Sequence, residues 1–363
     1  MSSYTSSPIS SPISSSISSP ISTFSTITEE RSTRTMADNI RKYKTEELID
    51  YLQRQDLDLK ESYFKIFRQK EISGFDFLET TKEEFCNYGL KAGPAKRLTE
   101  FINNLKKQKI RNFSSYKTLK ELKDILHKYK VNGEDITCIK QFNPVFEEIN
   151  DDDKALEQCI NEIILRLTNI KSMTDANEAT RCEFISSILH ASIAISQRLT
   201  NKEINIELQR NISGEEAFGR VNYIITGMED LLCITEGKPR NIKIGYLQNI
   251  KQLESLFHMN KWKRTADEIF KDDYNYLYGI VSTGIDWHFI IFASEGIFCT
   301  SNSEYQINLT KITLKKNCDI LKKDIKQIIS IIVGLLKDKI STCDEPGSKK
   351  LRVQEKIIKK ITR

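Results

Sequence analysis

Long apolar runs, secretion signals and the common catalytic signatures are all missing from this chain of 363 residues. No window approaches the roughly 18 consecutive apolar residues that mark a membrane-spanning helix, so we expect neither a transmembrane helix nor a membrane partner. The N-terminus lacks a basic region followed by an apolar block, which argues against a secretory signal peptide. The content of 39% hydrophobic and 29% charged residues instead indicates a soluble globular protein.

Paired cysteines are also lacking, because the eight cysteines are scattered singly, without a CxxC pair or a zinc-type spacing. This usage predicts buried reduced thiols in an intracellular protein of the nucleus or the cytoplasm. There is no GxxxxGK phosphate loop, no HExxH and no GxSxG motif, and the four histidines lie far apart in the sequence. The formal charge of +5 permits contact with nucleic acid without arguing for it.

Residues 1–36 repeat serine, proline and isoleucine in units such as SSPIS. Such a segment buries too little apolar surface to offset its ordering entropy, so we predict a disordered tail. Its Ser-Pro steps are candidate phosphorylation sites, and a merely permissive tail is the alternative interpretation.

Residues 37–109 show the pattern of five short helices, the last of them longer and amphipathic. This layout resembles the SAM (sterile alpha motif) domain family, and its signatures are Glu71-Ile72-Ser73-Gly74, Leu78 and Gly89-Leu90…Gly93-Pro94. The resemblance implies an all-α five-helix bundle that mediates protein association, and some members of the family bind RNA.

The charges of this segment favour association with other SAM domains or with a second copy of the chain. Two patches of opposite sign on different faces would suit a head-to-tail contact that builds open chains. Two alternatives are ordinary solvated helix faces, with acids early and bases late in each helix, and RNA binding by the basic last helix. The predicted interaction surface comprises the acids Asp76, Glu79, Glu83 and Glu84 and the bases Lys96, Arg97, Lys106 and Lys107.

Residues 110–172 contain two amphipathic helical patterns, the first over Tyr116–Tyr129 and the second after Asp151-Asp152-Asp153. Turns at Asn132-Gly133 and Asn143-Pro144 separate them. We expect a helical connector that packs on the following domain, not a free linker.

Residues 173–343 read as helix, strand, hairpin, helix, hairpin and helix. Glu178 begins an apolar helical stripe, which points this acid toward the domain core. A turn at Gly227–Asp230 would place Asn222 opposite Glu236 on paired strands, about 5 Å apart. Lys238 would lie on the same side of its strand as Glu236, because strand side chains alternate with a period of two.

The element order and the sequence Asn222…Glu236-x-Lys238 resemble the PD-(D/E)XK nuclease superfamily, in the variant of expanded fungal effector-like, Crinkler-type families. The resemblance implies a restriction-endonuclease-like α/β core over residues 173–343. It also implies a metal site of Glu178, Asn222 and Glu236, with Lys238 and Gln248 as further catalytic residues. The family's first metal-binding position is an aspartate, where this chain has Asn222.

Asn222 in that position removes a full charge from a site for Mg²⁺, which prefers anionic oxygen ligands. A short-range ion pair is worth on the order of several kcal/mol, so metal affinity should fall by orders of magnitude. We therefore predict a SAM-assembled interaction protein with a degenerate nuclease-like domain and at most weakly bound Mg²⁺. The alternative is an active Mg²⁺-dependent nuclease for DNA or RNA, with Glu207 conceivable as a replacement ligand. The basic tail, residues 344–363, is a further candidate contact to nucleic acid.

Overall fold

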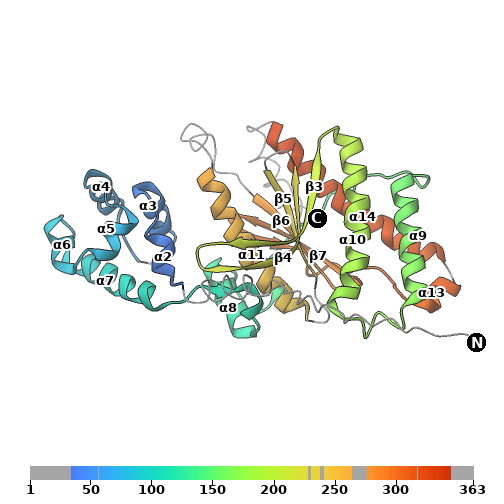
Figure 1. Ribbon diagram of the computed structural model, residues 1–363, viewed down its shortest axis with the longest axis horizontal. Coiled ribbons are helices and arrows are strands. Elements are labelled where there is room, and N and C mark those ends of the chain that lie inside the picture. The colour runs from blue at the N-terminus through green and yellow to red at the C-terminus, as the bar shows by residue number, and fades with distance from the viewer. Residues whose placement is uncertain are drawn as a thin grey trace, which may run out of the picture.

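The computed structural model describes residues 34–55, 57–227, 230–237, 241–263, 276–316 and 318–344. Most of the two predicted tails, residues 1–33 and 345–363, lies outside the described residues. A helical N-terminal region is followed by an α/β region built on one mixed sheet (Figure 1). This architecture confirms the expectation of a multidomain chain with a helical part before an α/β part. No helix in the described ranges is long and apolar enough to cross a membrane.

The N-terminal region holds a short helix followed by five more, with buried aromatic rings between them. The rings of Phe67, Phe77 and Phe85 lie 6.0–6.2 Å apart, centre to centre. Capping boxes at Ser73 and Thr81 begin two of the helices, as S/T-x-x-D/E sequences allow. The helices are α2 (Met36–Ile40), α3 (Thr45–Gln53), α4 (Glu61–Gln69), α5 (Gly74–Glu79), α6 (Lys82–Asn87) and α7 (Ala92–Lys107).

The described strands of the chain form one sheet in which β5 and β6 run parallel and most other neighbours run antiparallel. The long strands are β3 (Ile204–Ser213), β4 (Ala217–Gly227), β5 (Asp230–Gly237), β6 (Tyr276–Ser282) and β7 (Asp286–Ala293), with the shorter β8 (Gly296–Cys299) and β9 (Tyr305–Gln306). Two further strands come from the connector: β1 (Arg111–Asn112) pairs with β4, and β2 (Lys140–Gln141) pairs with β8. These two short strands of the connector therefore extend the sheet of the α/β region.

Helices cover both faces of the sheet (Figure 1). One face packs against α10 (Glu178–Thr200) and α14 (Cys318–Asp344), and α9 (Lys154–Asn169) packs on these two helices with the short α13 (Lys311–Lys316) beside it. The other face packs against α8 (Leu119–Lys128), α11 (Ile242–Lys263) and the 3₁₀ turns η1 (Phe113–Ser115) and η2 (Ile136–Cys138). Strand alternation divides the core accordingly, since Ile280 of β6 joins the first layer and Val281 the second.

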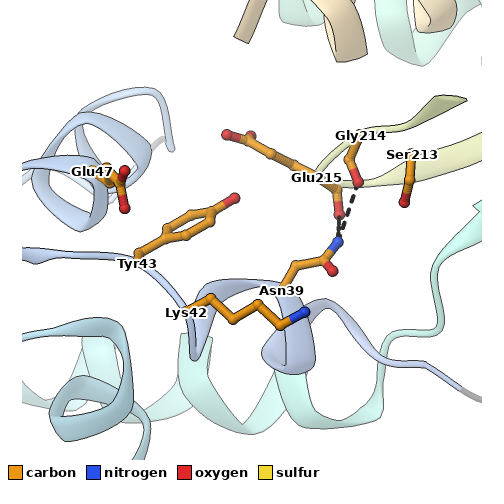
Figure 2. Close-up of a pocket in the computed structure, with 7 residues that line it drawn as sticks. All are labelled: Asn39, Lys42, Tyr43, Glu47, Ser213, Gly214 and Glu215. Atoms are coloured by element: carbon orange, nitrogen blue, oxygen red, sulfur yellow. Dashed lines mark hydrogen bonds between the residues drawn. The ribbon is translucent and has the colours of Figure 1, made fainter. Parts of the chain in front are cut away.

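The β3–β4 turn inserts between the helical region and the sheet. Asn39 Nδ2 of α2 donates to the carbonyl oxygens of Gly214 (3.2 Å) and Glu215 (3.0 Å) (Figure 2). Arg54 forms two hydrogen bonds to the Glu215 carboxylate, at 2.9 and 2.8 Å. Phe218 of β4 completes the apolar core of the N-terminal helices. These contacts fix the helical region on the sheet and leave a small cleft of about 280 Å³ beside the turn.

Candidate functional site

Glu178 and Asn222, two of the predicted site residues, lie in contact. Asn222 Nδ2 donates to Glu178 Oε1 at 3.3 Å and lies 3.9 Å from the sulfur of Cys182. Glu178 opens α10 after the N-cap Asn177, and both site residues are half-buried. The predicted helical stripe therefore does carry the acid to the sheet, one turn of helix before Cys182.

The hairpin turns at Gly227 and Asp230 as predicted, and a register shift between Ile225 and Thr226, which the sequence did not indicate, sets the pairing beyond it. Tyr223 pairs with Thr235, so the next position along the two strands sets Asn222 beside Glu236. Asn222 Oδ1 accepts a hydrogen bond from the backbone N–H of Gly237 at 3.2 Å. The Glu236 side chain and all of Lys238 lie outside the described residues, so their part in the site stays a prediction.

Gly237 marks a close approach between β5 and α10. A Cβ atom at this position would lie 3.0 Å from the sulfur of Cys182 and 3.4 Å from Cδ1 of Ile185. A larger residue would therefore displace the helix that carries Glu178. The glycine between Glu236 and Lys238 lets the N-terminal half of α10 pack directly on the strand end.

Arg181 is buried and fixes the start of α10. Its guanidinium donates to the carbonyl oxygens of Met173 (2.6 Å), Ala176 (3.0 Å) and Thr283 (2.7 Å). The first two carbonyls precede the helix, and the third lies in the β6–β7 turn. Arg181 therefore positions Glu178 by tying the helix start to the end of the parallel strand pair.

Gln248 lies elsewhere. It is buried on α11, on the opposite face of the sheet from α10, and its Nε2 donates to the carbonyl oxygen of Tyr116 at 2.8 Å. The structure thus does not bring Gln248 together with Glu178 and Asn222. In this position its amide anchors the connector to α11.

The side chains described at this point do not fit a resident Mg²⁺ ion. Asn222 turns its NH₂ group toward the Glu178 carboxylate, and its oxygen accepts from Gly237, whereas Mg²⁺ prefers anionic oxygen ligands. Glu207 is engaged by Arg210 at 2.8 Å on the exposed β3. Within the described ranges, no three acidic, histidine or cysteine side chains group as a metal site would require. We derive no metal-dependent step from this geometry.

Most of the predicted acidic residues of the helical region form caps or ion pairs within that region. Asp76 and Glu84 complete the capping boxes, and hydrogen bonds from Ser73 and Thr81 hold the pKa of each carboxyl below its usual range. Glu79 forms ion pairs with Arg41 (2.9 Å) and Lys106 (3.9 Å). In the described part of the chain, Glu83 is the member of this set with neither a cap nor an ion pair.

The predicted basic residues also differ in how far contacts within the helical region engage them. Arg97 donates to the carbonyl oxygens of Leu57 and Asp58, both at 2.9 Å, and so holds the loop between α3 and α4. Among the described residues, the ion-pair partner of Lys96 is Glu100, at 3.7 Å on the same helix. The sequence suggested two patches of opposite sign on different faces. Because Lys106 reaches Glu79, the acidic and basic sets instead touch at this point.

A partly buried network of charges at the base of the β3–β4 turn went unrecognised in the sequence: Lys251 and Glu254 are buried, Glu216 is half-buried and Lys128 is exposed. Lys251 contacts Glu216 (2.8 Å) and Glu254 (2.9 Å), and Lys128 contacts the same two acids (2.9 and 2.7 Å). The Tyr129 hydroxyl donates to Glu254 at 2.6 Å. Burial alone would raise the pKa of Glu254, but the two ammonium groups outweigh it and hold that pKa well below its ordinary value.

The network joins the connector, the β3–β4 turn and α11. The sequence contains the pair as Lys251-x-x-Glu254, in a stretch of α11 from Tyr246 to Leu256 that also holds Gln248, Asn249, Gln252 and Ser255. Charged side chains are almost never buried unless they are paired. Because this stretch mixes polar and apolar residues, the sequence did not mark the pair as buried, and it did not indicate the partners on other elements.

The comparisons with known proteins bear on the N-terminal region. A family model described as a SAM-like domain matches residues 14–104, about a quarter of the chain. A search of curated proteins and a search of solved structures each gave no match. The N-terminal helical region is therefore similar to SAM domains, which supports the resemblance carried by its turn and glycine signatures.

Proposed function

We propose that this protein acts by assembly: its SAM-like region binds other SAM-like regions, first of all a second copy, and its α/β domain is a nuclease-like module with weakened or lost catalysis. The observation that carries the first part is the SAM-like match together with an apolar core that residues 36–110 form among themselves and that Phe218 of β4 completes. Because SAM-like domains are commonly protein-interaction modules, protein association is the leading function for this region.

The charges available for such a contact are those without strong internal partners. Glu83 on α6 and Lys96 on α7 are exposed, and the 3.7 Å pair between Lys96 and Glu100 is a solvent-exposed contact of little energetic value. A heterologous contact between an acidic and a basic surface generates an open chain of subunits. We therefore assign Glu83 and Lys96 to opposite sides of a head-to-tail contact.

Light scattering on the full-length protein tests this assignment. The mass of the native chain should rise with concentration, and either Glu83→Lys or Lys96→Glu should hold the protein near one chain. Lys65→Glu, a charge reversal of an exposed residue on α4, is the matched control and should assemble like the native chain. A native chain that stays monomeric at every concentration, or single variants that assemble normally, would refute the proposal.

The proposal of weakened catalysis rests on Asn222, whose amide donates to Glu178 where the resemblance requires a second acid. Plasmid DNA and a long single-stranded RNA, each with Mg²⁺ or Mn²⁺, provide the test on the full-length chain. The native protein should leave both intact, while Asn222→Asp should restore measurable cleavage. Cleavage by the native chain that Glu236→Ala abolishes would instead establish the active nuclease.

A further inference from the structure

The segment from the end of α7 to the start of α8 carries only one sign of charge. Residues 101–120 contain no aspartate or glutamate and six basic residues. All six are exposed, on a path that runs through the last turn of α7, β1 and η1 and into the first turn of α8. We call them the junction strip: Lys106, Lys107, Lys109, Arg111, Lys117 and Lys120.

The structure folds this segment back on itself. Arg111 Nη2 donates to the carbonyl oxygen of Ser115 at 3.0 Å and pairs with Glu121 of α8 at 2.6 Å. Glu121 also accepts from the backbone N–H of Lys117 at 3.0 Å. These contacts hold Arg111 of β1 against the start of α8, in the segment that joins α7 to α8 between the helical region and the sheet (Figure 1).

Few acids neutralise the strip. Glu79 reaches Lys106 at 3.9 Å, and Glu121 binds Arg111. The described part of the chain has no ion pair for the amines of the other four lysines. Exposed polar side chains accompany the bases: Asn103 and Asn104 precede Lys106, and Gln108, Ser114 and Ser115 lie between the bases in the sequence. The hydroxyls of the two serines donate to Asn112.

We propose that the junction strip binds the phosphodiester backbone of a nucleic acid. Unpaired lysines with interleaved amides and hydroxyls are suited to phosphate oxygens, which accept most protein–nucleic acid hydrogen bonds. Phe113 and Tyr116 are buried, so the strip offers no ring on which a base could stack. Binding is therefore to the backbone and independent of sequence.

A protein partner fits the strip less well. The cores of protein interfaces are apolar and depleted of charge, whereas the one large apolar side chain exposed here is Leu119. The strip is also separate from the Glu178–Asn222 contact and from Glu83 and Lys96. The inference therefore does not depend on the assembly or on the state of the nuclease-like site.

Fluorescence anisotropy with the full-length chain tests the inference, using a labelled 20-nucleotide single-stranded RNA and a 20-base-pair DNA duplex. The test variant is the triple change Lys109→Gln, Lys117→Gln and Lys120→Gln, which leaves Lys96 and Lys107 in place. We expect at least a tenfold loss of affinity at low salt. The slope of log K against log salt should fall by about 0.7 for each lysine that contacts a single strand and by about 0.9 for a duplex.

The matched control is Lys65→Gln, Lys140→Gln and Lys171→Gln, which removes the same charge from exposed sites elsewhere. It should retain nearly the native affinity and salt slope. The inference is overturned if the native chain binds neither nucleic acid at low salt, or if both triple variants lose the same affinity. It is also overturned if the strip variant abolishes self-association while nucleic acid binding is unchanged, since the strip would then be a protein contact.

Discussion

Asn222 decides the chemistry at the contact between α10 and the hairpin. Its NH₂ group faces the Glu178 carboxylate, so the pair is a neutral donor with an anionic acceptor. With aspartate at this position, two carboxylates would stand within hydrogen-bonding distance, which disfavours ionisation of both. The asparagine that we propose weakens a metal site would thus also stabilise the chain without metal.

Asn222→Asp should therefore destabilise the metal-free protein. We expect a loss of about 1–2 kcal/mol in urea unfolding at pH 7, which lies within the usual range for single changes. The loss should shrink below about pH 5, where one carboxyl takes up a proton, and should also shrink in millimolar Mg²⁺ if the new pair binds the ion. Equal stability of variant and native chain at pH 7 without metal would show that the two side chains are not in contact.

The partly buried network depends on the balance of its charges. Lys251→Met would leave Glu216 and Glu254 with Lys128 as their remaining ammonium partner. Breaking a buried pair from one side costs about 3–5 kcal/mol, and thermal and urea unfolding should show a loss of this size. Lys123→Met, which breaks the exposed pair with Glu134, is the control and should cost less than about 1 kcal/mol. Equal small losses for both variants would contradict the arrangement described.

His288 should make the stability of the folded chain depend on pH, in a direction set by the shift of its pKa. Burial lowers the pKa of its ring below the ordinary value near 6.5. In the folded chain, the His288 ring therefore stays neutral at a pH at which the same ring binds a proton in the unfolded chain. Its contribution to stability is complete above about pH 6.5 and is lost as the pH falls.

His288→Phe should remove that dependence, since phenylalanine keeps the ring contact with Tyr246 but cannot titrate. The measurement is the urea midpoint between about pH 7.5 and 5. The native midpoint should fall more steeply than that of the variant over this range. Parallel curves would mean that His288 titrates alike in the folded and unfolded chains.

At the scale of elements, the sequence alone was sufficient to predict most of the long helices and strands of the α/β domain. The hairpin follows from apolar strands around a Gly227–Asp230 turn, and the observed pairing of Gly227 with Asp230 confirms it. The helix from Glu178 follows from its apolar stripe and its Asn177 cap. These features depend on residues close in sequence, whose periodicity can be read directly.

What escaped prediction depends on contacts distant in sequence. The two-residue strands β1 and β2 carry no periodic signal, yet they join opposite parts of the sheet. Lys251 pairs with Glu254 on its own helix and with Glu216 in the β3–β4 turn, 35 residues away, and Lys128 at the end of α8 pairs with the same two acids. Gln248 looked like a site residue on its helix, and only the layer order places it on the other face from α10.

The β3–β4 turn is the element that couples the two regions. Arg54 and Glu215 share two hydrogen bonds, and the Glu215 side chain is 8% exposed. Arg54→Met would leave this carboxylate nearly buried and without its guanidinium partner, and we expect a loss of about 2–3 kcal/mol. Hydrogen exchange should quicken across Ser213–Phe218 and α2–α3 first. Unchanged protection there would show that other contacts, such as those of Asn39 and Phe218, suffice to hold the regions together.

For the whole molecule, the consequence is a SAM-like region carried at a fixed position on the α/β domain. It lies at one end of the elongated chain, with α2 and α3 turned to the sheet (Figure 1). Glu83 and Lys96 belong to α6 and α7, and no described contact with the α/β domain involves either residue. Assembly through them would thus set α/β domains in a regular array along a core of SAM-like regions.

Mixing the two charge-reversal variants tests head-to-tail assembly most directly. Glu83→Lys keeps an intact basic side and Lys96→Glu keeps an intact acidic side, so neither should associate alone. Light scattering of an equimolar mixture should show masses of two chains or more, because the basic side of one variant can bind the acidic side of the other and the two reversed positions also carry opposite charges. If the mixture instead has the mass of single chains while the native protein assembles, then Glu83 and Lys96 do not form opposite sides of one contact, and the proposed head-to-tail assembly is wrong.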